Sequence, residues 1–363
     1  MLRAAVIGLG RMGSTYDDEM TTGGSVFLPY AHAPSYVATP GVELVAGADP
    51  HEEQRTIFGE RWGVATPHLY ADYREMLATE QLDIVSVCTS TRLRAQIVID
   101  AARAGVRAIW AEKPIALTLA EADAMVAVCR EHGVALAINC ARRWNPFFAQ
   151  TRNLIETGAL GDILQVNAFG QCGLSHNGSH LIDAVRFLAG GNVAWLFGEM
   201  ESDEAAAGEE DLMGNGYLAF DNGVRAFLRG MPTGPAFWEF DVIGSTARVR
   251  LVNNNANVEY TVMQPDGRGR TVPMQAAFPW PTVIEGTGVT IVRDLIHAIA
   301  TGQPPRCSGE DGRAALEVAV ALRESHRQGG CKIALPLDNR ELGILSSELR
   351  SDAVPARVRR LAQ

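Results

Sequence analysis

Residues 4–13 read Ala4-Ala5-Val6-Ile7-Gly8-Leu9-Gly10-Arg11-Met12-Gly13, a short apolar run followed by the pattern Gly-x-Gly-x-x-Gly. In a strand–turn–helix unit each glycine has its own task. Gly8 forms the tight turn, Gly10 lets the backbone approach a pyrophosphate, and Gly13 allows close packing of helix on strand. The first N–H groups of the following helix would face the phosphates. The stretch predicts a dinucleotide-binding Rossmann unit, with these residues at the cofactor: Gly8, Gly10, Arg11, Met12 and Gly13.

Strand-like and helix-like segments alternate through the rest of the first third of the chain. Short apolar runs bounded by Gly or Asp predict strands, and longer segments between them predict helices. This alternation is typical of βαβ units and of a parallel sheet with helices on both faces. We expect strands at 4–7, 42–48, 83–88, 106–110 and 135–138, and helices at 73–77, 95–104 and 119–132.

The pattern changes after about residue 145. Strand-like runs at 163–170, 216–220, 224–229, 238–243 and 248–251 predict a mainly antiparallel sheet, and helices are expected at 180–188, 290–300 and 312–328. A length of 363 residues is enough for two domains, each with its own core. We expect an α/β protein with a Rossmann domain at 1–125, an α+β domain at 126–337 and a C-terminal extension at 338–363.

Composition narrows the classes of partner. A net charge of −10 and a pI of about 5.4 disfavour nucleic acid, which requires a clustered basic face. No apolar run approaches the roughly 20 residues of a membrane helix, and the N-terminus is typical of a first strand rather than of a signal peptide. The six scattered cysteines predict buried free thiols. We expect a cytoplasmic protein that binds neither nucleic acid nor membrane.

A carboxylate suited to the adenosine ribose ends the second predicted strand. Asp49 follows the run 42–48, farther from Gly13 than the roughly 20 residues of the usual unit. The Gly/Thr-rich segment 14–30 explains the excess as an insertion. Asp49 would accept a hydrogen bond from a 2′-hydroxyl and repel a 2′-phosphate, and residues 50–53 contain no Arg or Lys. NAD is therefore favoured over NADP.

The insertion carries three consecutive carboxylates, Asp17-Asp18-Glu19. They would repel a pyrophosphate, so they should point outwards or contact another partner. A solvated loop is one interpretation. A substrate lid or a subunit contact is the other, because Phe27-Leu28-Pro29-Tyr30 offers an apolar anchor. We take the lid as the hypothesis.

A candidate reactive residue, Lys113, lies in Glu112-Lys113-Pro114, at the carboxyl end of a predicted parallel strand. Ligands of open α/β sheets bind in the crevice outside these strand ends. A partly desolvated lysine there can act as a proton donor, and Pro114 would fix the chain direction beyond it. Residue types alone leave a surface lysine beside a turn equally open.

Together with Gly8–Gly13 and Glu112–Pro114, the segment Gly178-Ser179-His180-Leu181-Ile182-Asp183 makes the sequence resemble the glucose–fructose oxidoreductase / inositol dehydrogenase / MocA family. Ala141–Pro146 and Ser308–Gly312 extend the resemblance, which covers nearly all of residues 1–337. It implies a Rossmann domain and an α+β domain whose large open sheet commonly forms dimer or tetramer interfaces. It also implies oxidation or reduction of sugars, polyols and related compounds with NAD(P).

Compared position by position, Lys113 matches the family's catalytic lysine and His180 its acid/base histidine. Glu112 matches a residue near the nicotinamide. We further expect Thr89, Ser90, Glu112 and Lys113 at the cofactor, and Arg143 and His176 together with Lys113 and His180 at the substrate.

Two positions depart from the family pattern. His176 stands where an aspartate is usual, and a protonated imidazole there would lower the pKa of both Lys113 and His180. Ser90 and Arg94 stand where proline and histidine are usual; Arg94 would either bind an acidic substrate group or form a structural salt bridge. The His-x-x-x-His spacing of 176 and 180 suits a metal, but the Glu of His-Glu-x-x-His is missing, so we expect no metal.

The predicted reaction is reversible hydride transfer between a substrate carbinol carbon and the nicotinamide. His180 would take the hydroxyl proton, Lys113 would hydrogen-bond the same oxygen, and His176 would position His180. One alternative is an enzyme that keeps NAD bound and recycles it for epimerisation, isomerisation or glycoside cleavage. A second is a non-catalytic NAD or sugar sensor. In the extension, Leu342, Ile344, Leu345 and Leu349 suggest a short helix.

Overall fold

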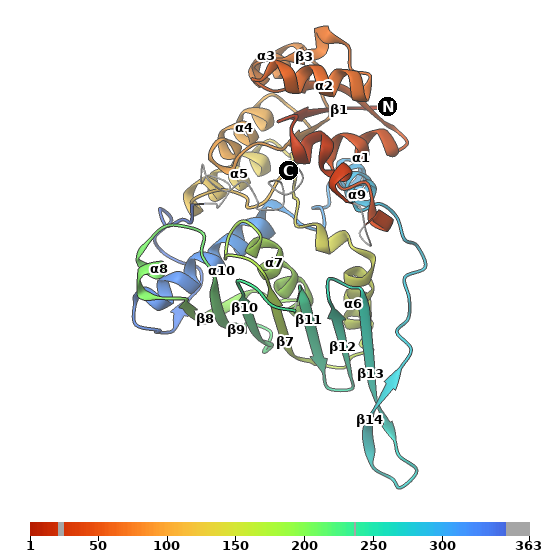
Figure 1. Cartoon of the computed structure of the whole chain (residues 1–363), viewed down its shortest axis with the longest axis vertical. Helices are drawn as coiled ribbons and strands as arrows, with labels where there is room; N and C mark the ends of the chain where they lie inside the picture. Colours follow the sequence, from red (N-terminus) through yellow and green to blue (C-terminus); the bar gives the residue numbers. More distant parts are fainter. Residues whose placement is uncertain (21–24, 236, 346–363) are drawn as a thin grey trace, which may run out of the picture.

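The computed structural model describes residues 1–20, 25–235 and 237–345, and Figure 1 shows that they form two stacked parts. A parallel sheet with its helices lies at one end and a larger, mainly antiparallel sheet at the other. The predicted α/β class with a Rossmann domain and an α+β domain is confirmed.

The first sheet has six parallel strands in the order β3-β2-β1-β4-β5-β6. Its central strands are apolar and buried on both faces, as parallel strands between two helix layers must be. The order reverses between β1 and β4, so the crevice at their carboxyl ends is where such sheets bind ligands. The strands are β1 (Leu2–Ile7), β2 (Val42–Ala48), β3 (Leu69–Tyr70), β4 (Ile84–Val87), β5 (Ala108–Ala111) and β6 (Ala135–Ile138).

Five helices connect these strands, and local sequence signals set where they begin. A capping box starts α5. The Thr118 side chain accepts a hydrogen bond from the backbone N–H of Glu121, and the Glu121 carboxylate accepts one from the backbone N–H of Thr118. Asp72 caps α3 in the same way through the N–H of Arg74. The helices are α1 (His32–Ala38), α2 (Glu52–Trp62), α3 (Tyr73–Thr79), α4 (Thr91–Arg103) and α5 (Leu119–Glu131).

The first crossover differs from the expected strand–turn–helix. After Gly10 the chain forms a π-type turn at Arg11–Thr15 and a 3-10 turn at Tyr16–Glu19, and the first α-helix begins only at His32. Another 3-10 turn, Ser25–Phe27, lies between them. The described residues of the insertion, 14–20 and 25–30, therefore contain short turns where the usual unit has its helix.

The second sheet has nine strands in the order β14-β13-β12-β11-β7-β10-β9-β8-β15, and only the β7–β10 pair is parallel. Helices α6, α7 and α10 pack on one face, and the other face carries no layer of described residues (Figure 1). The strands are β7 (Ile163–Gly170), β8 (Val193–Met200), β9 (Gly214–Phe220), β10 (Arg225–Gly230), β11 (Glu239–Gly244), β12 (Ala247–Val252), β13 (Asn257–Pro265), β14 (Thr271–Ala276) and β15 (Ile333–Ala334).

Side-chain burial alternates along the strands of this sheet. In β10, Ala226 and Leu228 are buried under the helices, while Phe227 and Arg229 are exposed on the open face. The helices of this half are α6 (Pro146–Glu156), α7 (Gly178–Ala189), α8 (Asp203–Ala207), α9 (Thr287–Thr301) and α10 (Gly309–Arg327).

The two halves are interleaved. Helix α9 packs against α1 and β6 of the Rossmann half, whereas α10 lies between the second sheet and α5. The expected boundary at 125/126 falls inside α5, and β6 still pairs with β5, so the first sheet ends at Ile138. The boundary is set by this last parallel strand and not by the change in sequence pattern.

The structure also bears on the expectations for the cysteines, for membrane helices and for the C-terminal extension. Four cysteines are buried as free thiols, Cys88 is half-buried and Cys331 is exposed. None of the described helices is long and apolar enough to cross a membrane. In the extension, Gly343 and Leu345 make β-bridges to Thr118 and Glu210 in place of a helix, and the expected helical residue Leu349 lies outside the described residues.

Candidate active site

The three glycines of the first turn have different surroundings. A Cβ on Gly13 would lie 2.0 Å from the carbonyl oxygen of Gly8, and one on Gly8, whose φ is +89°, would lie 2.8 Å from that of Cys88. At Gly10 no atom of the described residues comes within 4 Å of such a Cβ. Packing therefore requires Gly8 and Gly13, whereas Gly10 faces open space at the point where the strand order reverses. This fits a backbone that must approach a dinucleotide.

Asp49 links this turn to the end of β2. Its Oδ2 accepts the Leu9 N–H at 2.9 Å, and its Oδ1 accepts the N–H of His51 at 2.9 Å. The side chain is buried at the predicted ribose position and keeps acceptor capacity for a ribose hydroxyl. Sequence reasoning missed Arg55, whose guanidinium on α2 donates to the Asp49 and Pro50 carbonyls at 2.8 and 3.0 Å.

The insertion is tied to the Rossmann domain by its carboxylates. Arg11 donates to Glu19 at 2.5 and 2.8 Å and stacks on Tyr16, and the hydrogen bond that Glu19 accepts raises the pKa of Arg11. Asp18 pairs with Arg61. Asp17 accepts two backbone N–H groups, those of Tyr30 and Ala31, at the start of α1. These contacts hold the insertion in place while Asp18 and Glu19 remain exposed, and the lid stays a prediction.

Thr89 and Ser90 follow β4, beside the glycine turn. The Thr89 hydroxyl is buried without a hydrogen-bond partner among the described residues, and Ser90 precedes α4 without capping it. An orphaned hydroxyl at this edge suits a ligand group. Arg94, 1% exposed, donates to the carbonyls of Thr89 and Pro114 and so joins the turns after β4 and β5.

Glu112 lies at the centre of a buried polar group. Its Oε1 accepts from Asn139 at 2.6 Å and contacts His32 Nε2 at 3.2 Å. His32 in turn stacks on Trp110 and bonds Ser86, whose hydroxyl also meets Tyr36. Burial by itself would raise the pKa of Glu112, but the bond from His32 and the nearby Lys113 outweigh it and lower the pKa to about 2. Glu112 is thus a fixed negative charge beside Lys113.

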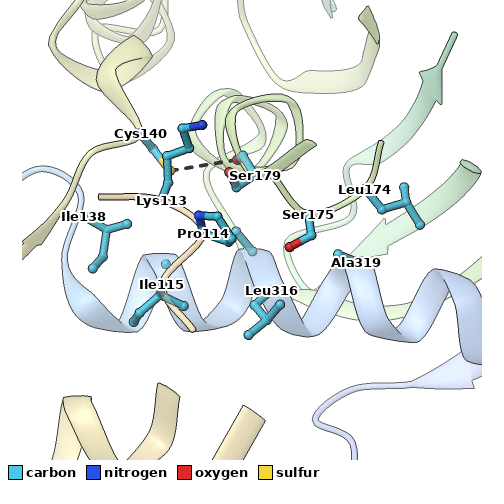
Figure 2. Close-up of a pocket in the computed structure, with 12 residues that line it drawn as sticks. Lys113, Pro114, Ile115, Ile138, Cys140, Leu174, Ser175, Ser179, Leu316 and Ala319 are labelled. Atoms are coloured by element: carbon cyan, nitrogen blue, oxygen red, sulfur yellow. Dashed lines mark hydrogen bonds between the residues drawn. The ribbon is translucent and has the colours of Figure 1, made fainter. Parts of the chain in front are cut away.

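Lys113 reaches from β5 to the second half of the molecule. Its Nζ donates to the carbonyl of His176 at 3.2 Å and to Asn177 Oδ1 at 3.4 Å. Figure 2 shows its amino group pointing away from α10 and from the small apolar cavity that Ile115 and Leu316 line. The lysine amine is therefore presented at the junction between the halves. Sequence reasoning did not identify Asn177.

His180 stands in the first turn of α7, and its Nδ1 is buried with no hydrogen-bond partner among the described residues. Burial, followed by the charges of Lys113, Arg142 and His176, lowers the pKa of His180 well below its usual value. The imidazole is therefore neutral at pH 7 and able to take a proton.

His176 precedes α7, so His176 and His180 do not share a helix face as the metal spacing would require. Its N–H donates to Asp211 Oδ2 at 2.7 Å, and the Ser175 N–H donates to Oδ1 at 2.7 Å. Asp211 is buried and fixes the turn that carries the carbonyl bound by Lys113. Sequence reasoning missed it because it lies far along the chain, before β9. Among the described residues, the gathered metal-type ligands are Cys140, Asp183 and Cys307.

Arg143 does not join this group. Its buried guanidinium donates to Asp183, Asp311 and the Arg306 carbonyl, so its nitrogens are engaged in an internal ion-pair cluster. The geometry therefore favours a structural role over the expected substrate contact. The preceding residue, Arg142, is the arginine whose charge acts on His180.

The chain is similar to several known proteins. Residues 2–140 match a model described as an oxidoreductase family with an NAD-binding Rossmann fold, and residues 152–335 match the C-terminal alpha/beta domain of that family. D-apiose dehydrogenase of Paraburkholderia graminis is 29% identical over 333 residues, 84% of this chain and 87% of that protein. Myo-inositol 2-dehydrogenase of Thermotoga maritima is 24% identical over 348 residues, 89% and 96% of the two chains.

A solved structure of levoglucosan dehydrogenase with NADH and levoglucosan shares the fold. It superposes with a TM-score of 0.75 at 20% identity, covering 93% of this chain and all of that one (100%).

Proposed function

Because this chain belongs to the Gfo/Idh/MocA family of NAD-binding oxidoreductases, we propose that it transfers a hydride between NAD and a hydroxyl or carbonyl carbon of a sugar, polyol or sugar derivative. The observation that carries the proposal is the meeting of Lys113 with the turn that leads into His180. This contact joins Lys113, which follows β5 of the parallel sheet, to the turn four residues before His180, and so supports a pair of proton-handling side chains drawn from different halves.

NAD, when bound, supplies the nicotinamide carbon that accepts or returns the hydride. Gly8, Gly10 and Gly13 would carry its phosphates and Asp49 its ribose, with Thr89 and Ser90 alongside. During substrate oxidation the neutral His180 accepts the hydroxyl proton. Lys113, charged and held by the His176 carbonyl, hydrogen-bonds the same oxygen and stabilises its developing negative charge. Glu112 keeps Lys113 cationic, and His176 orients the pair.

The test is a Lys113→Ala variant, measured with a substrate from a panel of sugars, polyols and sugar acids assayed by NADH absorbance. We expect kcat to fall about 10²–10⁴-fold, the range for a lost proton-handling group. The NADH dissociation constant should stay within a factor of about two, because no cofactor-cradle contact is removed. A near-normal kcat would end the assignment.

The residue at 176 supports a second candidate function. A histidine where the family usually has aspartate changes the charge around Lys113 and His180, which suits a closed cycle that oxidises and re-reduces the sugar on resident NAD. Near-equimolar NAD(H) released on denaturing the purified protein would favour this cycle, and an empty protein would favour the dehydrogenase. A sensor without catalysis has no use for both Lys113 and His180.

We also propose a homodimer or homotetramer in the cytoplasm. The open face of the second sheet exposes an aromatic cluster of Trp195, Phe197, Tyr217 and Phe227, with ring centroids 5.0–6.4 Å apart. Exposed apolar patches of this kind mark association surfaces.

A further inference from the structure

Arg142 lies in the 3-10 turn Ala141–Trp144, which packs against α7, the helix that carries His180, and it has no carboxylate partner among the described residues. Among the described residues, its hydrogen-bond acceptor is the amide oxygen Oδ1 of Asn254 at 3.4 Å, and its Nε is buried with no acceptor. Most buried arginines are paired, as the neighbouring Arg143 is with Asp183. The guanidinium of Arg142 thus retains unused donors at the site.

The aromatic residue on which Arg142 stacks, Trp238, has a strained backbone. The guanidinium lies 4.1 Å from the ring centroid of Trp238, which is buried and has a φ of +59°, a left-handed conformation that bulky residues rarely adopt. The backbone N–H of Asn254 donates to the Trp238 carbonyl at 3.0 Å. A Cβ at Gly170 would lie 2.8 Å from the Trp238 ring, so this glycine makes room for it. Strain of this kind clusters at ligand sites.

The charges that act on His180 are positive. Lys113, His176 and Arg142 all act on His180 and lower its pKa. The carboxylates of Glu112 and Asp211, on which the Lys113 charge acts, are already engaged, Glu112 by His32 and Asn139 and Asp211 by backbone N–H groups. A neutral polyol would leave the Arg142 charge uncompensated in a partly desolvated site, whereas an anionic substrate would compensate it.

We propose that the substrate carries an anionic group, a carboxylate, and that Arg142 binds it while Lys113 and His180 handle the reacting hydroxyl. The substrate class is then a sugar acid or polyhydroxy acid. The proposal rests on the proposed function, which it narrows. A sugar phosphate offers the same anionic chemistry, and the experiment separates the two.

The experiment titrates the protein–NADH complex by calorimetry with matched acid and polyol probes: D-gluconate against D-glucitol, and L-tartrate against L-threitol. D-Glucose 6-phosphate is the phosphate probe. We expect at least one acid to bind about tenfold or more tightly than its polyol, from a charge-assisted hydrogen bond. Arg142→Gln should abolish that difference and leave polyol binding within about twofold.

Arg74→Gln is the matched control, because Arg74 also stacks on an aromatic ring, Tyr73, at 4.5 Å but lies on α3. Arg74→Gln should leave the binding of both the acid and the polyol probes unchanged. Thermal unfolding with NADH shows whether each variant folds, and Arg142→Met, which also removes the charge but keeps an apolar stem to pack on Trp238, replaces Arg142→Gln if the latter does not.

Equal binding of acids and polyols, equal loss of both in Arg142→Gln, or no acid binding up to the millimolar range would overturn the proposal. Tight binding of the phosphate alone would assign the site to sugar phosphates and overturn the carboxylate. Turnover of neutral polyols but not of acids would defeat this inference and leave hydride transfer standing. Acid binding that depends on Arg142, without NADH formation from NAD, would support this inference and defeat the proposed hydride transfer.

Discussion

At the scale of single residues, the site depends on environment more than on residue type. Lys113 and His180 could be identified from the sequence because each stands in a distinctive motif. Arg142 and Arg143 are adjacent and identical in type, and only the structure separates the engaged guanidinium from the unpaired one. Asp211 carries no local motif, since its role depends on N–H groups more than 30 positions earlier in the chain.

The pH dependence of the reaction reports the state of His180. A base must be unprotonated to accept a proton, and burial lowers its pKa well below the ordinary value of 6.5. We therefore expect kcat for oxidation to stay constant from pH 8 down through about 6.5 and to fall only at lower pH. A kcat profile with NAD checks this. An acid limb at or above the ordinary histidine pKa would contradict the assignment, and His180→Gln should remove the limb with most of the activity.

At the scale of elements, two structural features could not be predicted from the local patterns. The crossover after Gly13 was expected to be a helix, but short turns held by Asp17 and Glu19 replace it. Strands β8, β13 and β14 and helix α6 were not predicted, because a half-exposed sheet strand carries a weak alternation and its pairing partners are distant in sequence. The parallel strands other than the two-residue β3 were predicted closely, since burial on both faces makes them continuously apolar.

Substitutions at two glycines of the first turn should separate an effect on cofactor binding from an effect on folding. Gly10→Val should leave the melting temperature nearly unchanged and abolish NADH binding, because its side chain would enter the open cradle and meet no described atom. Gly13→Ala should instead destabilise the fold by several kcal/mol, because its Cβ would lie 2.0 Å from the Gly8 carbonyl oxygen. Thermal unfolding and NADH fluorescence titration measure both. Normal cofactor binding by Gly10→Val would show that the cradle lies elsewhere.

The turn before α7 depends on Asp211. Asp211→Ala leaves two buried backbone N–H groups without acceptors, at about 1–3 kcal/mol each, and frees the carbonyl that holds Lys113. We expect lower denaturant stability together with a kcat about tenfold lower and little change in NADH affinity. Asp211→Asn, which keeps one acceptor oxygen, should have a stability and a kcat between those of the native protein and of Asp211→Ala. Asp241→Ala, which removes an ion pair on the open sheet, is the control and should preserve kcat.

At the scale of the whole molecule, the proposed reaction takes place between the two halves. The parallel sheet provides Lys113 and the glycine cradle, and the second half provides His180, its supporting turn and Arg142. The order of the two domain types was predictable from the change in strand pattern. The return of α9 to the Rossmann half was not predictable in detail, because the contact joins segments far apart in sequence.

Assembly should depend on the open sheet face. Phe227 is 47% exposed within the aromatic cluster, so Phe227→Asp would place a charge in the centre of an apolar contact. We expect light scattering after size-exclusion chromatography to give an oligomer for the native chain and a smaller species for the variant. An unchanged mass would show that this face does not hold the subunits together. Arg74→Gln again serves as the surface control.

The central claim is tested most directly by following the hydride. A substrate from the panel, deuterated at the carbinol carbon, is incubated with NAD, and the mass of the NADH produced is measured. We predict deuterium in the NADH formed by the native protein, and its loss together with turnover in Lys113→Ala. NADH without deuterium, or deuterium transfer at an undiminished rate in Lys113→Ala, would contradict the account.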